Sequence, residues 1–166
     1  GSEMEYYVAS LDFTKYIRMP GRWRFRINSE LAYGDAFGDT TSLPPFRNRY
    51  AGGPGSVRGY KQSHLGPMDS RGNPYGGNMK VVTRAEIIMP VPQKWQTSAR
   101  ISLFYDMGNV FQTGNRYTFL GRDGVTPIDY GFDYDKLKHS AGLSVQWLAP
   151  LIGIAFLVAA LQGTVA

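Results

Sequence analysis

The chain has 166 residues, with 18 Lys and Arg against 13 Asp and Glu, which gives a formal net charge of +5 at pH 7. Because it has no cysteine and only two histidines, His64 and His139, it lacks a disulfide framework, a thiol nucleophile and a Cys-bound zinc, and we expect neither metal nor cofactor. So small a charge does not indicate a nucleic-acid partner, whereas 20 glycines, 10 prolines and 14% aromatic residues favour turns and strands over long helices.

The chain does not open with a secretory signal. Its first residues, Gly1-Ser2-Glu3-Met4, resemble a cloning-derived start joined to an internal segment, which predicts a piece of a longer protein. The longest apolar run, 148–161, contains Pro150 and Gly153 and is shorter than the roughly 20 residues that an α-helix needs to cross a bilayer. A helical membrane protein is therefore not expected.

Five segments alternate apolar and polar residues with a period of two, which is typical of strands: 7–17, 22–34, 79–89, 99–107 and 137–147. In the clearest, large apolar side chains oppose charged and amide side chains: Trp23, Phe25, Ile27, Leu31 and Tyr33 against Arg22, Arg24, Arg26, Asn28 and Glu30. Each segment has the nine or more residues of a tilted transmembrane strand, against about 5 or 6 in a usual soluble strand. A sixth candidate, 151–161, is apolar on both faces.

Short connections at 19–21, 90–97 and 149–153 alternate with long ones at 35–78 and 109–136. Outer-membrane barrels have this asymmetry, with short periplasmic turns and long extracellular loops. Aromatic residues fall at both ends of the segments, as membrane girdles would: Trp23, Trp95 and Trp147 at the short turns, and Tyr33 and Phe111 at the long loops.

The predicted fold is all-β, an antiparallel transmembrane β-barrel portion with about five or six meandering strands. The smallest bacterial single-chain barrels have eight strands, so the rest of a larger barrel is expected to come from elsewhere. A soluble antiparallel sandwich or lipocalin-like barrel also alternates and is the alternative, although shorter strands would be usual there.

The first long connection contains a glycine-rich stretch, residues 50–60, whose one cation is Arg58. A connection of this length is functional or disordered, and the glycines favour an ordered series of tight turns. No Gly-Lys-Ser/Thr follows, so the stretch is a weak signal for nucleotide binding.

Four motifs in order along the chain resemble the BamA-type insertase family of the bacterial outer membrane. They are Val57-Arg58-Gly59-Tyr60, preceded by Phe46 and Tyr50-Ala51-Gly52-Gly53; Gly76-Gly77-Asn78; residues 104–111, FYDMGNVF; and residues 140–147, SAGLSVQW. The resemblance covers about residues 11–150. It implies that the loop at 35–78 is the family's sixth extracellular loop, that this loop folds back into the barrel, and that Arg58 contacts acidic residues on the inner wall.

The alternation supplies acidic candidates independently, because Glu86 and Asp106 lie on the polar sides of adjacent segments. The guanidinium fork of Arg58 can address two carboxylates, although a solvated loop arginine is the alternative. Phe104 shares the polar side with Asp106, which suits either a packed loop or a filled narrow lumen. Gly108 is expected to end its strand.

Other polar groups and the chain end give weaker signals. Arg22, Arg24 and Arg26 predict a solvated lumen wall, with steering of a client or a lipid headgroup as the alternative. The aspartates of the second long loop lack the spacing of an EF-hand and are expected to be solvated: Asp123, Asp129, Asp133 and Asp135. The family ends in an alternating strand with a terminal aromatic, whereas 159–166 matches neither feature, so no final strand is expected.

The resemblance implies part of an insertase in the bacterial outer membrane that assembles and inserts β-barrel proteins, and not an enzyme. It implies unfolded outer-membrane protein clients, assembly-complex lipoproteins and outer-membrane lipid as partners, no nucleic acid, and no catalytic residues. The periplasmic domains and early strands are expected to be absent from this chain. One alternative is a two-partner secretion transporter, whose loop shares the motif; another is a hydrolase barrel using His139 and Ser140.

Overall fold

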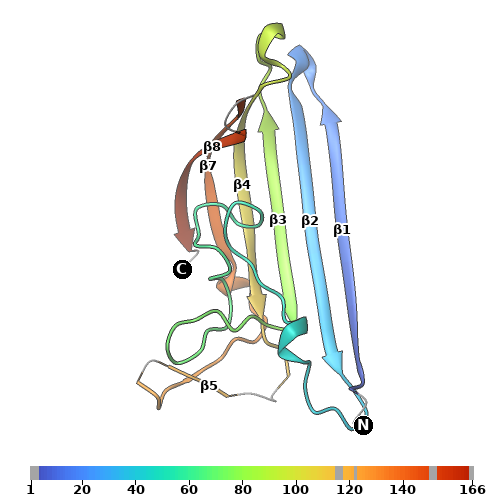
Figure 1. The fold of residues 1–166 in the computed structure, drawn as a ribbon, viewed down its shortest axis with the longest axis vertical. Coiled ribbons are helices and arrows are strands. Elements are labelled where there is room, and N and C mark those ends of the chain that lie inside the picture. Colours follow the sequence, from blue (N-terminus) through green and yellow to red (C-terminus); the bar gives the residue numbers. More distant parts are fainter. Residues whose placement is uncertain (1–3, 115–117, 122, 150–152, 165–166) are drawn as a thin grey trace.

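The computed structural model describes residues 4–114, 118–121, 123–149 and 153–164, and side chains up to residue 147. Six antiparallel strands form one sheet: β1 (Tyr6–Arg18), β2 (Arg24–Ala36), β3 (Met79–Ile88), β4 (Ala99–Phe111), β7 (Lys138–Ala149) and β8 (Gly153–Thr164). Their order in the sheet, β1-β2-β3-β4-β7-β8, follows the chain, as Figure 1 shows. The all-β antiparallel meander predicted from the sequence is thereby confirmed.

The remaining elements are short. Two two-residue strands, β5 (Phe119–Leu120) and β6 (Pro127–Ile128), pair with each other in the second long loop. Four single-turn 3-10 segments complete the described part: η1 (Pro20–Arg22), η2 (Pro45–Arg47), η3 (Gln93–Trp95) and η4 (Tyr134–Lys136). Among the described residues, no helix has the length and apolar content to cross a membrane.

The two faces of the sheet have opposite character. The connection between β2 and β3 returns along one face, which we call the loop-bearing face, and the other is the bare face (Figure 1). Buried polar residues line the loop-bearing face: Asn28, Glu86, Ser102, Asp106, Ser140 and Ser144. Large apolar residues are exposed on the bare face: Leu11, Phe13, Ile17, Leu103, Tyr105, Leu143 and Trp147. This arrangement reverses the usual distribution of a soluble protein, in which large apolar side chains are buried.

The start of β2 and the end of the chain differ from the sequence prediction. Segment 22–34 was expected to begin at Arg22, but β2 begins at Arg24, because Gly21 (φ 69°) and Arg22 (φ 65°) both adopt the left-handed conformation of the preceding turn. Arg22 therefore does not belong to the polar stripe of β2. The chain end differs in part. The sixth candidate, 151–161, largely coincides with β8, but the expectation of no final strand from residue 159 onward was wrong, because β8 extends through Thr164 and pairs with β7 along its length.

Two residues on β4 also differ from expectation. Gly108 was expected to end the strand, but β4 continues to Phe111, and Gly108 pairs with both Val82 and Lys138. Phe111, expected in an aromatic girdle, is only 1% exposed and packs edge-on against Phe132 of the second loop, with ring centroids 5.0 Å apart. At the short-turn end, Trp95 and Trp147 are exposed and form an edge-on pair at 6.1 Å.

A small apolar core lies between the first long loop and the loop-bearing face. It consists of Ala51, Val57 and Leu65 from the loop and Val82 and Val110 from β3 and β4, with Tyr60 packed against it. Val57 and Val82 have no exposed surface. Full burial of each such side chain stabilises the docked loop by about 1.5–3 kcal/mol, so the loop is an ordered part of the fold.

Candidate loop-docking site

The first long loop is ordered by backbone pairing. Three isolated antiparallel β-bridges connect its segments: Arg49 with Gly77, Ala51 with Leu65, and Met68 with Pro74. Gly52 adopts φ 103°, and a Cβ there would lie 2.5 Å from the carbonyl oxygen of Lys61, so the tight turn before Val57 requires glycine. These contacts fix the loop backbone where it meets the sheet.

Arg58 is the polar centre of the docked loop. Its Nε and Nη2 donate to Asp106 Oδ2 and Oδ1, each at 2.7 Å, and its backbone N–H donates to Oδ2 at 3.0 Å. Its Nη1 donates to Glu86 Oε1 at 2.5 Å. The guanidinium therefore forms a bidentate pair with one carboxylate and a single bond with the other, on neighbouring strands β4 and β3.

This ion-pair group is almost completely removed from solvent. Arg58 is 5% exposed, Glu86 4% and Asp106 0%. The guanidinium carbon of Arg58 lies 3.9 Å from the ring centroid of Phe104, so the aromatic face covers the charge. Burial disfavours the charged form of Arg58, but its hydrogen bonds and charge interactions with Asp106 and Glu86 outweigh burial and raise its pKa.

Glu86 joins this group to the neighbouring wall. Its Oε2 accepts from Arg100 Nη2 at 2.6 Å and from Arg26 Nη1 at 3.4 Å, while Oε1 accepts from Arg58. One carboxylate is thus shared by three arginines from β2, β4 and the loop.

The other residues of the Val57-Arg58-Gly59-Tyr60 motif also meet the sheet. Val57 enters the apolar core, and Gly59 takes a left-handed conformation with φ 88°. Tyr60 donates its hydroxyl hydrogen to the backbone oxygen of His139 on β7 at 3.0 Å. Gly108 leaves the β3 backbone room, because a Cβ at this position would lie 2.6 Å from the carbonyl oxygen of Val81. The structure thus brings the motif together with Glu86, Phe104 and Asp106, and places Gly108 two residues along β4.

A second arginine contact was missed by the sequence reasoning. Arg84, on β3, donates to the loop carbonyl oxygen of Gly55 and pairs with Glu30 on β2. Its Nε also donates to Asn28 Oδ1 at 2.9 Å, and Asn28 in turn donates to Asp12 on β1 at 2.9 Å. The signal was available, because Arg84 is two residues from Glu86 on the same face of β3.

The residues considered for hydrolase chemistry do not form a nucleophile–base pair. The hydroxyl group of Tyr105 and Nδ1 of His139 are hydrogen-bonded at 2.6 Å, and Tyr105 is exposed on the bare face. Ser140 is buried on the loop-bearing face, because consecutive strand residues point to opposite sides. The side chains of His139 and Ser140 are therefore separated by the sheet.

The aspartates of the second long loop organise local turns. Asp123 accepts from the backbone N–H groups of Val125 and Thr126 at 3.1 and 3.0 Å, and Asp129 pairs with Lys136 at 2.8 Å. The hydrogen bond that Asp123 accepts from the Thr126 hydroxyl group has the largest effect on its pKa. Together with the two backbone hydrogen bonds, it lowers the pKa of Asp123 to about 2.

Comparison with known proteins shows what the chain is similar to. The model of the Omp85 superfamily domain matches residues 1–162. The outer membrane protein assembly factor BamA of Neisseria meningitidis serogroup B is 34% identical over an alignment 165 residues long that covers 91% of this chain. The match covers 21% of the length of that relative, so the chain spans about a fifth of it.

Proposed function

Since the chain belongs to the Omp85 superfamily, we propose that it is the C-terminal barrel portion of an outer-membrane protein assembly factor, locked by Arg58 through its first long loop. Its location is the bacterial outer membrane. The buried contact of Arg58 with Asp106 and Glu86 is the observation that carries the proposed lock.

The proposed orientation in the membrane is supported by the reversed faces of the sheet. The bare face, with its exposed apolar residues, would contact lipid, and the loop-bearing face would line the lumen. The six-stranded sheet has two edges, at β1 and β8, and lipid cannot satisfy the backbone groups of an open edge. We infer that a longer parent chain supplies the remaining strands and the periplasmic domains, and that the loops at 35–78 and 109–136 are extracellular.

The proposed mechanism needs no covalent chemistry, and we assign no catalytic residue. A barrel that opens between two strands offers backbone donors and acceptors to an incoming client strand, which adds to the sheet edge. The driving force is the burial of the client's apolar strand faces in lipid together with satisfaction of its backbone hydrogen bonds. The partners are accordingly unfolded outer-membrane protein clients, assembly-complex lipoproteins and lipid.

In this proposal the loop rigidifies β3, β4 and β7, whose pairing must persist while the barrel opens between two other strands. Arg58 and Tyr60 connect the loop to β3, β4 and β7 through side-chain and backbone contacts. Loss of the Arg58 contacts should therefore loosen the loop first, while the strands persist.

The experiment is depletion of the full-length parent in its own cell, followed by heat-modifiable gel mobility of many unrelated outer-membrane barrels. A broad fall in their folded fraction supports the assembly function. Loss of one exported partner alone would instead support a two-partner secretion transporter. The contact of Arg58 with Asp106 and Glu86 is tested separately by re-expression of the full-length parent with Arg58→Ala. If this variant assembles outer-membrane proteins as the wild type does and its loop has wild-type protease resistance, the proposed lock is contradicted and the assembly function is not.

A further inference from the structure

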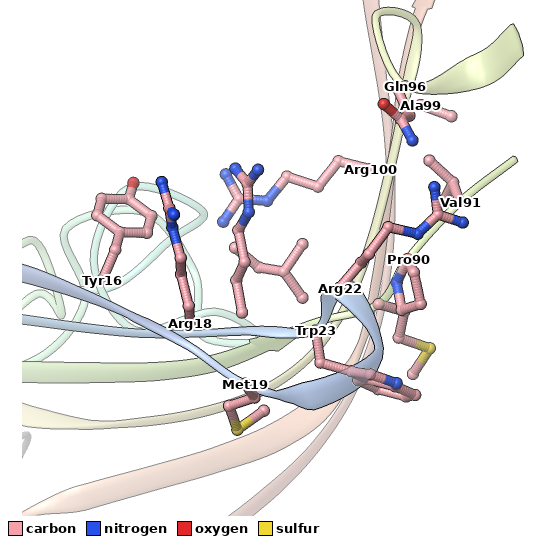
Figure 2. Close-up of a pocket in the computed structure, with 13 residues that line it drawn as sticks. Tyr16, Arg18, Met19, Arg22, Trp23, Pro90, Val91, Gln96, Ala99 and Arg100 are labelled. Carbon is pink, nitrogen blue, oxygen red and sulfur yellow. The ribbon is translucent and has the colours of Figure 1, made fainter. Parts of the chain in front are cut away.

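A cavity of about 760 Å³ lies at the short-turn end of the sheet, and arginine provides all of its charged lining. Arg18, Arg22, Arg24 and Arg100 line it, and neither Asp nor Glu does so among the described residues. In Figure 2, Arg100 from β4 extends across this space toward the side of Arg18 from β1, Tyr16 lies beside Arg18, and Arg22 extends away on the side of Val91.

The strand register brings like charges together. Arg18 on β1 lies directly opposite Arg24 on β2, and Arg26 follows two residues later on the same face of β2. Like charges directly opposite each other in an antiparallel pair are destabilising. A bound anion would remove this repulsion.

The carboxylate that Arg26 and Arg100 contact is also engaged by the first long loop. Glu86 pairs with Arg58, Arg100 and Arg26, whereas Arg18 and Arg24 have no ion pair within the part of the chain that the structure describes. The positive charge of this region is therefore not balanced by the described residues.

Two buried hydrogen-bond donors support the same conclusion. The Nε atoms of Arg26 and Arg100 are buried and have no acceptor among the described residues. Buried polar groups normally have a partner, so each of these N–H groups is a position for an acceptor that the described residues do not provide.

We propose that Arg18, Arg24 and Arg100, which line this cavity, form a binding site for a phosphate group at the short-turn end of the loop-bearing face, together with Arg26, which follows Arg24 on the same face of β2. A guanidinium group can donate two hydrogen bonds to one phosphate group. Four guanidinium groups together have more donors than the two oxygens of one carboxylate can accept. This site goes beyond the assembly function. A phospholipid headgroup and free phosphate share the required chemistry.

The test uses the full-length protein that contains this chain, purified in uncharged dodecyl maltoside micelles. Inorganic phosphate and water-soluble dihexanoyl phosphatidylglycerol are titrated separately, with ³¹P NMR line broadening as the readout. We expect saturable binding that weakens about tenfold or more in the double variant Arg18→Gln/Arg24→Gln. Arg71→Gln, which removes the same kind of charge from the first long loop, is the matched control and should bind as the wild type does.

The two probes distinguish the source of the phosphate. Tighter binding of the lipid supports a headgroup, and equal or tighter binding of inorganic phosphate supports a free ion. The site is overturned by unsaturable binding of both probes or by an equal loss in Arg71→Gln. It is also overturned if added hexaglutamate reverses the ³¹P line broadening at a lower concentration than either phosphate probe needs to bind, which would indicate an acidic peptide. Heat-modifiable gel mobility verifies that the double variant is folded, and Arg18→Lys/Arg24→Lys, which keeps the charge without the forks, should bind with intermediate affinity.

Discussion

Two groups of charged residues on the loop-bearing face differ in how their arginines are paired with carboxylates. The first group is Arg58 with Asp106 and Glu86, and the second is the arginines at the short-turn end. Arg58 is buried between Asp106 and Glu86, with four hydrogen bonds to these two side chains. At the short-turn end, Arg18 and Arg24 face each other, and the nearby Glu86 is shared by three other arginines. The comparison teaches that the first group is satisfied internally and holds the fold together, whereas the second retains positive charge that a ligand can use.

The largest expected effect is at Asp106. Asp106→Ala leaves Arg58 buried without its bidentate partner, which costs about 3–5 kcal/mol for a buried pair. We expect the first long loop of the full-length protein to lose its protease protection at lower urea, while the strands retain heat-modifiable mobility. Asp39→Ala, at an exposed position of the same loop, is the matched control. Unchanged protection in Asp106→Ala would show that the ion pair does not hold the loop.

A smaller effect is expected at Arg84, the wall residue that donates to the loop carbonyl of Gly55. Arg84→Gln should reduce loop protection by about 1–3 kcal/mol, because Asn28 and Glu30 also lose one of their partners each. Arg84→Lys keeps the charge but not the fork, so its loss should be intermediate. The readout is the cleavage rate near residues 54–56, and equal rates in both variants and the wild type would remove Arg84 from the docking site.

The strands could be predicted from the sequence because alternation has a direct physical cause. In a strand, side chains point alternately to two faces, so the apolar and polar sets of 7–17, 79–89 and 99–107 match the two faces of β1, β3 and β4. The location in the outer membrane also followed from the motifs, and the comparisons confirm it; of the family resemblance, they confirm membership of the Omp85 superfamily. The predicted strand start at Arg22 was wrong. The alternation of apolar and polar residues continues through residues 22 and 23, although the backbone at Gly21 and Arg22 is a left-handed turn and not a strand.

The loop contacts were only partly predictable. Glu86 and Asp106 could be selected because charged residues at these strand positions share one face, but the path of a loop of some forty residues is set by its glycines and bridges. Alternation also does not reveal that the loops cover the end of β4, and for this reason Phe111 was assigned to a girdle although it is buried. The contact of Arg84 with Gly55 depends on the same folded path.

A third prediction tests the short-turn end. Arg24→Gln removes one of two like charges that face each other across β1 and β2, so the free energy of unfolding should be unchanged or rise by about 0.2–1 kcal/mol. The measurement is the urea midpoint of the full-length protein in phosphate-free buffer at low salt. High salt should reduce the difference, because exposed charges are screened. A clear loss of stability would mean that Arg24 has an internal partner, and it would weaken the contrast between the two arginine groups.

The smallest effect concerns Asp123, an exposed carboxylate that contrasts with buried Asp106. Its pKa is lowered to about 2 from 3.8 by hydrogen bonds that the carboxylate accepts in the folded turn, first from the Thr126 hydroxyl group and then from backbone N–H groups. Because the folded-state pKa is depressed, its stabilisation is fully present above the ordinary value and is lost as the pH falls through about 2. Amide hydrogen exchange of Val125 and Thr126 should therefore show a turn that persists at pH 4 and opens near pH 2, whereas opening already between pH 5 and 4 would contradict these hydrogen bonds. Asp123→Asn keeps an acceptor without a titrating charge, so its turn should not respond to pH in this range.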